Sequence, residues 1–323
     1  MTGLPKSVMI FEEGPREGFQ VEKGPIATDD KVRLIDALSE TGVKHIQVGS
    51  FVDPRRVPGM ADVHDVVKRM KVVPGVEYSA LWMNERGLRS ALEYPQLSVD
   101  GKLRLYPSET FLKTNMGRTP EQHAQKNVEL IALCRNLNVP VKQASLSSAF
   151  GCNFQGDIST DLLVRLVQDT LELTRANGVE LDELIVTDTM AWATPEAVRH
   201  VVGIMQEKFP TLEIRLHLHD TRGLGLANAY AGLLMGVRLF DSSVAGLGGC
   251  PFAKHKGAAG NICTEDFVLM CEEMGIATGI NLEAMLAAAS IAEEVVGHAV
   301  PGHTVKAGSL SEIRARAKAA TGR

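Results

Sequence analysis

Short runs of β-branched and other apolar residues alternate with longer segments of helical periodicity along the whole chain of 323 residues. This alternation is typical of βα units that build a parallel sheet. The eight strands that we predict lie at residues 7–14, 45–51, 77–84, 102–108, 141–149, 183–189, 214–220 and 239–246. Eight units without a Pro/Gly/Ser-rich linker favour a closed (β/α)8 TIM barrel over an open doubly wound sheet. We expect one barrel domain with a C-terminal helical extension over residues 1–300, and a basic tail over residues 301–323 whose last segment, residues 309–323, is exposed.

The starts of three helices can be placed from single residues. Thr119 and Thr194 each precede a proline, so we expect each threonine to cap a helix that has this proline in its first turn. After the first strand, we expect Thr28 and Asp29 to cap a helix that ends at Gly42. No G-x-G-x-x-G pattern follows the first strand, which weakens the dinucleotide-binding alternative.

Composition and charge narrow the class of protein. With 45% hydrophobic and 23% charged residues, the chain has a globular composition, and its net charge of −5 argues against a nucleic-acid partner. The five cysteines are scattered and odd in number, which favours a reducing, cytoplasmic setting over a disulfide framework. The N-terminal apolar run is too short for a secretory segment or a membrane span, so we expect no membrane partner.

Polar residues gather where the predicted strands end, which is where a TIM barrel carries its active site. The segment EEGPREG (12–18) follows the first strand, Asp188 follows the sixth, and His217 and His219 end the seventh. The two histidines alternate with a leucine, so both side chains point to the same face, toward the barrel interior. Two imidazole nitrogens together with a carboxylate oxygen suit one divalent cation.

The same residues also have a purely structural interpretation. The carboxylates could form ion pairs with Arg16, Lys23 and Arg222, and the two histidines could be partly buried and hydrogen-bonded to their neighbours. An H-x-H pair by itself is weak evidence for a metal. From the residues alone, both interpretations stay open.

Several segments resemble one enzyme family, in the same order along the chain. They are EEGPREGFQVEK (12–23), SFVDPRRVPGM (50–60), TDTMAWATP (187–195), HLHDTRGLGLANAYAGLLMGV (217–237), DSSVAGLGGCPFA (241–253) and GNICTEDFVLM (260–270). They resemble the hydroxymethylglutaryl-CoA lyases of the DRE-TIM metallolyase superfamily, and the last two segments distinguish these lyases from the synthases that share the barrel. The resemblance implies cleavage of 3-hydroxy-3-methylglutaryl-CoA to acetyl-CoA and acetoacetate with a divalent cation, Mg²⁺ or Mn²⁺.

The resemblance also implies the residues of the site. The residues implied to be catalytic are Arg16, Asp188, His217 and Cys250. The implied metal ligands are Glu17, His217, His219 and Asn261, and the implied substrate-binding residues are Gln20, Lys23, Gln47, Ser50, Thr189 and Trp192. Cleavage of a tertiary alcohol next to a thioester needs a base, a cationic clamp for the enolate and a proton donor. Arg16 matches the clamp and Cys250 the proton donor, while His217, Asp188 and Glu17 all stay open as the base.

Four features depart from the family pattern. Glu17 stands where the family has an aspartate, and Gln47 stands where it has a glutamate. The loop PFAKHKGAAGN (251–261) is longer and gains three basic residues, and residues 190–192 put Met-Ala-Trp where the family has a small, glycine-rich stretch. We therefore expect an altered acyl specificity, with citramalyl-CoA or a longer 3-hydroxy-3-alkylglutaryl-CoA as alternative substrates. A condensing synthase of the superfamily and a non-catalytic binding protein are the alternatives outside the lyases.

The expected partner is a small-molecule acyl-CoA substrate. The resemblance further implies a homo-oligomer, either a dimer or a tetramer. A role in leucine degradation follows only if the family's usual substrate is retained.

Overall fold

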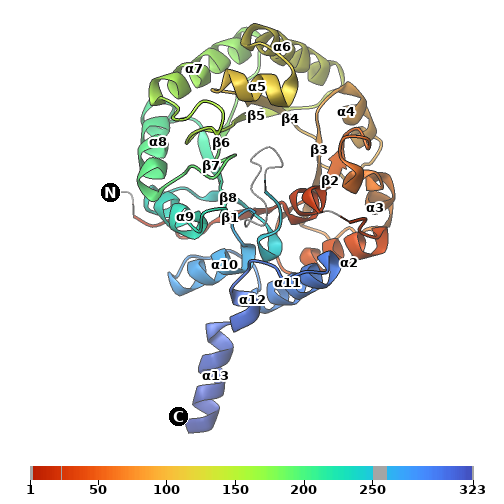
Figure 1. Cartoon of the computed structure of the whole chain (residues 1–323), viewed down its shortest axis with the longest axis vertical. Coiled ribbons are helices and arrows are strands. Elements are labelled where there is room, and N and C mark those ends of the chain that lie inside the picture. The colour runs from red at the N-terminus through yellow and green to blue at the C-terminus, as the bar shows by residue number, and fades with distance from the viewer. Residues whose placement is uncertain (1–2, 23, 250–259, 322–323) are drawn as a thin grey trace.

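The computed structural model of the protein describes residues 3–22, 24–249 and 260–321. Eight parallel strands form one curved sheet in the order β3-β2-β1-β8-β7-β6-β5-β4, and helices surround it as a ring (Figure 1). The predicted (β/α)8 barrel is therefore confirmed. Within the described residues no ladder of hydrogen bonds joins β3 to β4, so the backbone bonding of the barrel is open at this one seam.

All eight predicted strands are present, and most are shorter than the apolar runs that predicted them. Their bounds are β1 Met9–Glu12, β2 His45–Phe51, β3 Glu77–Trp82, β4 Gly101–Leu105, β5 Val141–Leu146, β6 Glu183–Thr187, β7 Glu213–His217 and β8 Leu239–Ser242. The difference lies mainly at the C-terminal ends, where the chain leaves the sheet to build turns. The polar residues of the candidate site therefore sit on these turns and on the last residues of the strands.

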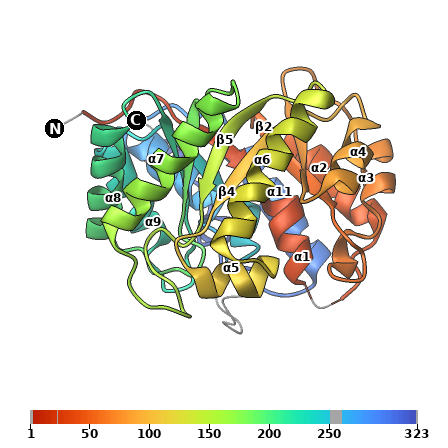
Figure 2. The same ribbon diagram turned by 90° about the horizontal axis from the view of Figure 1, so that it is seen from above.

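The helices follow the strands in the predicted alternation. Their bounds are α1 Phe19–Val21, α2 Thr28–Ser39, α3 Val63–Arg69, α4 Glu85–Leu92, α5 Glu109–Met116, α6 Pro120–Asn136, α7 Thr160–Ala176, α8 Pro195–Lys208, α9 Gly225–Leu234, α10 Thr264–Glu273, α11 Leu282–Val296, α12 Thr304–Ala307 and α13 Leu310–Thr321. Three short turns complete them: η1 Gly14–Gly18, η2 Pro58–Met60 and η3 Val244–Gly246. Figure 2 shows α1 and α5 at one end of the barrel, the end where β1 and β4 finish.

The C-terminal segment leaves the barrel as a helix. In Figure 1, α13 extends away from the body of the protein, and none of its residues is buried. Arg314 of α13 is bound to Glu273 of α10 at 2.6 Å. No helix in the described part of the chain is both long and apolar enough to cross a membrane.

Two of the three predicted helix starts are correct. The side chains of Thr119 and Thr194 accept hydrogen bonds from the backbone N–H groups three residues on, and a proline follows each of them. The prediction for Thr28 and Asp29 is wrong, because the helix already includes both residues and Ala27 stands at the cap position without a side-chain bond. The Thr28 hydroxyl instead donates to Oδ2 of Asp62 at 2.8 Å, which ties α2 to the segment before α3.

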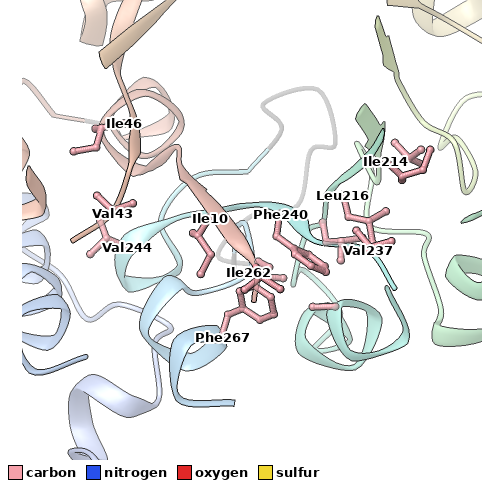
Figure 3. Close-up of a cluster of buried hydrophobic side chains, with 14 of the residues drawn as sticks. Ile10, Val43, Ile46, Ile214, Leu216, Val237, Phe240, Val244, Ile262 and Phe267 are labelled. Carbon is pink, nitrogen blue, oxygen red and sulfur yellow. The ribbon is translucent and has the colours of Figure 1, made fainter. Parts of the chain in front are cut away.

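The main hydrophobic core fills the layer between the sheet and the helices. Figure 3 shows Ile10, Leu216 and Phe240 on the outer face of the sheet, with Phe267 of α10 packed against them. The rings of Phe240 and Phe267 lie 4.8 Å apart between centroids. Apolar side chains therefore hold the helices to the outside of the barrel, and the alternate strand positions are left to face its interior.

Glu12, the last residue of β1, connects the turn after β1 to the segment after β8. Its Oε1 accepts hydrogen bonds from the backbone N–H groups of Gly14 at 2.7 Å and Val244 at 2.8 Å. Its Oε2 accepts from the hydroxyl of Thr264 at 2.7 Å. Glu12 is fully buried, and this burial raises its pKa from 4.5 to about 7. The turn after β1 and the segment after β8 are thus fixed to the same carboxyl group.

We expect the substitution Glu12→Gln to change how stability depends on pH. Because the pKa of Glu12 rises on folding, the folded state holds more protons than the unfolded chain between pH 4.5 and about 7, so the wild type loses stability as the pH rises through this window. Glutamine keeps an acceptor for the two N–H groups but has no proton to lose. The unfolding free energy of the wild type should fall by about 3 kcal/mol relative to Glu12→Gln across this window.

Chemical denaturation at a series of pH values measures this difference. Glu180, an exposed residue between α7 and β6, provides the control, and Glu180→Gln should follow the wild type at every pH. A wild-type minus Glu12→Gln difference that stays constant from pH 4.5 to 7 would show that burial does not perturb Glu12.

Candidate metal centre and active site

Three potential ligands converge at the C-terminal end of the barrel. Glu17 lies in the turn η1 after β1, His217 is the last residue of β7, and His219 follows two residues later. The Nε2 of His217 lies 3.7 Å from Oε1 of Glu17, and the Nε2 of His219 lies 3.9 Å from Oε2. These separations are long for hydrogen bonds, but two ligands that share one cation at about 2 Å lie on the order of 3–4 Å apart. All three residues are buried.

The far nitrogen of each histidine ring is fixed by a hydrogen bond. Nδ1 of His217 lies 2.9 Å from Oδ2 of Asp241, and Nδ1 of His219 lies 2.6 Å from the carbonyl oxygen of Asp188. An oxygen at each Nδ1 favours the tautomer with its proton there, which leaves the lone pair of Nε2 directed toward Glu17. Hydrogen bonds of this kind orient histidines that bind metals in proteins.

Two buried atoms beside Glu17 have no hydrogen-bond partner among the described residues, and both are potential ligands. They are Nε2 of His219 and the side-chain oxygen of Asn261. The amide nitrogen of Asn261 donates to Oε2 of Glu17 at 2.7 Å, so its oxygen is held close to the same centre. Unsatisfied buried acceptors are rare in proteins, and a cation would satisfy both of these. The four residues expected to bind the metal therefore lie together, and their two nitrogens and two kinds of oxygen fit one divalent cation.

The charges of this cluster match the same interpretation. Although burial alone would raise it, the pKa of Glu17 lies well below its usual value because Arg16, His217 and His219 favour the carboxylate. Burial alone would lower the pKa of His217, yet Glu17 and Asp241 raise it to about 9. The centre therefore has enough negative charge to hold a proton on His217, and a divalent cation would take the place of this proton.

Arg16 lies in η1 beside Glu17. Its guanidinium group binds the carboxylates of Glu13 and Glu17 and donates to the side-chain oxygen of Gln47. The ion pairs that the structural interpretation predicts for the carboxylates of the acidic segment are therefore present at Arg16. The predicted ion pair of Arg222 is wrong, because its guanidinium group donates to the backbone carbonyls of residues 190 and 191.

The turn after β6 carries Asp188 and Trp192. Oδ1 of Asp188 accepts the backbone N–H groups of Trp192 at 2.7 Å and Ala193 at 3.1 Å, whereas Oδ2 is buried and has no partner in the described structure. Burial raises the pKa of Asp188. The indole N–H of Trp192 donates to Oδ1 of Asn153 at 2.7 Å. A Cβ atom at Gly151 would lie 2.4 Å from the indole ring, so the ring position requires glycine there.

The other residues predicted to belong to the site do not form one cluster, and some lie outside the described residues. The hydroxyl of Thr189 accepts the backbone N–H of Ser148 at 2.9 Å. Ser50 is buried, and its hydroxyl has no partner in the part of the chain that the structure describes. Gln20 is half-buried in α1. Cys250 and Lys23 lie outside the described residues, as do the three basic residues of the loop, Lys254, His255 and Lys256.

Our reading of the sequence missed Asp241 of β8, the partner of His217. The two residues are directly paired in the register of β7 and β8. A signal was present, because Asp241 is the one charged residue of β8 and directly follows two apolar residues. Asp241 lies one residue before the end of its strand, so the position at a strand end that marks His217 does not mark it.

Comparisons with known proteins agree with this geometry. The HMGL-like family model matches residues 7–292. The chain is 39% identical over 304 residues to the hydroxymethylglutaryl-CoA lyase of Bacillus subtilis, and the aligned region covers 94% of this chain and 97% of that protein. The crystal structure of the B. subtilis HMG-CoA lyase superposes with a TM-score of 0.86 and 37% identity over 95% of this chain and 99% of that chain. A structure of an HMG-CoA lyase from Acinetobacter baumannii in complex with coenzyme A and 3-methylmalate has a TM-score of 0.82 and 34% identity, covering 96% of this chain and 98% of that chain.

Removal of both histidines should abolish metal binding. We expect His217→Ala together with His219→Ala to weaken the affinity for Mn²⁺ by at least about 100-fold, since even substitutions of groups that only orient metal ligands cost 10–100-fold. Electron paramagnetic resonance of free Mn²⁺ during a titration measures this without any substrate. His200→Ala, an exposed histidine on α8, is the control. Unchanged Mn²⁺ affinity in the double variant would rule out this centre.

Proposed function

Because the chain belongs to the HMGL-like family, the family of the hydroxymethylglutaryl-CoA lyases, we propose that it is a carbon–carbon lyase that cleaves a 3-hydroxy-3-methylglutaryl-CoA-like thioester to acetyl-CoA and a keto acid. The observation that carries this proposal is the convergence of Glu17, His217, His219 and Asn261 beside Arg16. A divalent cation held by these four residues would polarise the hydroxyl group of the substrate and fix its orientation.

The reaction is a retro-Claisen cleavage, and this chain has a cation placed for its developing charge. When the carbon–carbon bond breaks, the electron pair moves onto the acetyl-CoA part, whose thioester oxygen becomes an enolate oxygen. Arg16 keeps its charge at every pH of interest and has planar donors that suit this oxygen. Its bonds to Glu13, Glu17 and Gln47 hold the guanidinium group in place before the substrate binds.

Asp188 is the best of the three candidate bases. Its Oδ2 is buried and has no partner within the described ranges of the chain, while Oδ1 is fixed by two backbone N–H groups. Glu17 and His217 are instead directed at the proposed cation and are already bound to other side chains. We therefore assign acceptance of the hydroxyl proton to Asp188, and return of a proton to the enolate carbon to Cys250, as the family resemblance implies.

The two departures around Arg16 have complementary effects in this arrangement. Gln47 meets Arg16 with a neutral oxygen, so this partner adds no negative charge. Glu17 has one methylene more than aspartate, and one of its oxygens reaches Arg16 while the other reaches Asn261. Glu17 can thus supply a counter-charge for Arg16 and a ligand oxygen with the same side chain. This arrangement supports a working enolate clamp in spite of the changed sequence.

We also propose the finer features of the activity. Oxygen and imidazole ligands favour Mg²⁺ or Mn²⁺ as the cation. The four described cysteines are free thiols, which supports a reducing compartment such as the cytoplasm. Gln20, Lys23, Ser50 and Thr189 are proposed to bind the substrate, the protein to be a dimer or a tetramer, and its role to be leucine degradation if hydroxymethylglutaryl-CoA is the substrate. The related structure with 3-methylmalate and coenzyme A keeps other acyl groups, such as citramalyl-CoA, among the candidates.

Arg16→Gln should separate catalysis from metal binding. With Mg²⁺ or Mn²⁺ present, we expect the wild type to release acetyl-CoA from hydroxymethylglutaryl-CoA, detected by mass spectrometry. Removing the charge from the enolate oxygen should lower kcat by about 100–1000-fold, whereas Mn²⁺ affinity should change far less. Arg16→Lys, which keeps the charge but not the planar donors, should recover part of the loss. Full activity of Arg16→Gln would exclude the clamp.

Trp192 is expected to limit the size of the acyl group. Trp192→Gly should raise kcat/KM for a longer 3-hydroxy-3-alkylglutaryl-CoA relative to hydroxymethylglutaryl-CoA by about 10–100-fold, because a pocket that gains space for one or a few methylenes changes discrimination by this much. Tyr230→Ala, a half-exposed aromatic residue on α9, serves as the control. An unchanged ratio of the two kcat/KM values would show that Trp192 does not line the acyl pocket.

A further inference from the structure

The two histidines of the metal centre are held in different ways. Nδ1 of His219 lies against a backbone carbonyl, that of Asp188, whose position is fixed by the course of the chain. Nδ1 of His217 lies 2.9 Å from Oδ2 of Asp241, which belongs to a side chain with rotatable bonds. The direction in which Nε2 of His217 points therefore depends on what holds the carboxylate of Asp241.

Arg215 holds the other oxygen of this carboxylate. Its Nη1 lies 3.3 Å from Oδ1 of Asp241, so the carboxylate joins the guanidinium group to the imidazole ring of His217. The strands explain this contact, because His217 and Asp241 are paired across β7 and β8. Arg215 lies two residues before His217 on β7, and Leu216 between them faces the outer side of the sheet (Figure 3). Arg215 thus reaches Asp241 from the layer of the barrel interior below the metal centre.

Two further contacts fix Arg215 itself. Its Nε donates to Oε1 of Glu183 at 2.9 Å, and its Nη2 binds the same oxygen. Its guanidinium carbon lies 3.8 Å from the centre of the ring of Phe11, and the face of an aromatic ring attracts a cation. Arg215 is only 4% exposed, but it also lines a cavity inside the barrel, so packed side chains do not surround it on every side. Its polar contacts therefore determine where the guanidinium group lies.

The shape of the guanidinium group is what this arrangement uses. Arg215 binds two carboxylates with three nitrogen atoms and lies across an aromatic ring at the same time. A lysine at this position would carry the same charge as a compact ammonium group, which has no planar set of donors. Buried ion pairs contribute little to stability, because the cost of taking the charges out of water offsets their attraction. The contacts of Arg215 therefore matter more for geometry than for the stability of the barrel.

We propose that Arg215 is a positioning residue for the metal ligand His217 and that it acts through Asp241. This inference rests on the proposed function, because it takes His217 to bind the cation. Without the planar donors of Arg215, the carboxylate of Asp241 can rotate, and the ring of His217 is no longer held with Nε2 toward Glu17. His219 keeps its direction, since a backbone carbonyl holds it.

The substitution Arg215→Lys tests this role, because it keeps the charge and removes the planar donors. The cavity beside the residue leaves space for the ammonium group. We expect Mn²⁺ to bind about 10-fold more weakly, which is the size of effect typical of groups that orient metal ligands. Electron paramagnetic resonance of free Mn²⁺ measures this affinity without a substrate. Arg238→Lys makes the same change at an exposed arginine that pairs with Glu213, and it should bind Mn²⁺ as the wild type does.

A double-mutant cycle shows whether Arg215 acts through Asp241. Asp241→Asn keeps the size of the side chain, but its amide has lost the charge that binds Arg215 and can turn its NH2 group toward the ring of His217. This variant should itself bind Mn²⁺ about 10–100-fold more weakly. In its background Arg215→Lys should have no further effect, because the connection to His217 is already broken.

A second variant loosens Arg215 from its other side. Glu183→Gln removes one of the two charges that hold the guanidinium group and leaves Asp241 unchanged. It should weaken Mn²⁺ binding less than Arg215→Lys does, and this loss should also disappear in the Asp241→Asn background. Thermal unfolding shows which variants are folded. If Arg215→Lys does not fold, the cycle of Glu183→Gln with Asp241→Asn decides the question.

The outcomes separate this inference from the proposed function. Unchanged Mn²⁺ affinity in a folded Arg215→Lys variant would overturn the positioning role, even if the protein cleaves hydroxymethylglutaryl-CoA. Equal losses of affinity with Asp241 and with Asn at this position would overturn it as well, because Arg215 would then not act through Asp241. A loss that disappears in the Asp241→Asn background, in a protein that cleaves none of the tested thioesters, would retain the positioning role and reject only the proposed reaction.

Discussion

A charge inside the barrel is stable only beside a counter-charge, because taking an ion out of water costs several kcal/mol. This constraint links the interior of the protein to its site. Arg215 lies across the ring of Phe11 and binds Glu183 and Asp241, and Asp241 also holds Nδ1 of His217. The position of a proposed metal ligand is thus set by ion pairs that begin in the middle of the barrel.

The fold could be predicted because its signals are local and repeated. Each βα unit shows the change from an apolar run to helical periodicity, and the caps at Thr119 and Thr194 depend on neighbouring residues only. Thr28 failed as a cap because a residue distant in sequence, Asp62, binds its hydroxyl group. The open seam between β3 and β4 gives no signal in the sequence, since it depends on how the strands meet in space.

The site could be predicted only as far as its residues lie at strand ends. That rule found Arg16, His217 and His219, and family resemblance added Asn261. It did not find Asp241, which lies inside a strand, where the pleat and the register decide whether a charged side chain faces the interior. The direction of the Trp192 ring could not be predicted from the sequence either. It depends on the absence of a side chain at Gly151, which lies on another turn and is distant in the sequence.

The bond between Glu12 and Thr264 spans 252 residues, and this has a consequence for the newly made chain. A ribosome adds about 5–20 residues per second, so β1 and its polar turn leave it on the order of 10–50 s before the segment that completes them. During this interval Arg16 and Glu17 exist without the histidines, and β1 has an edge without β8. Cells therefore have to keep a half-made sheet from pairing with other chains until the last strand is synthesised.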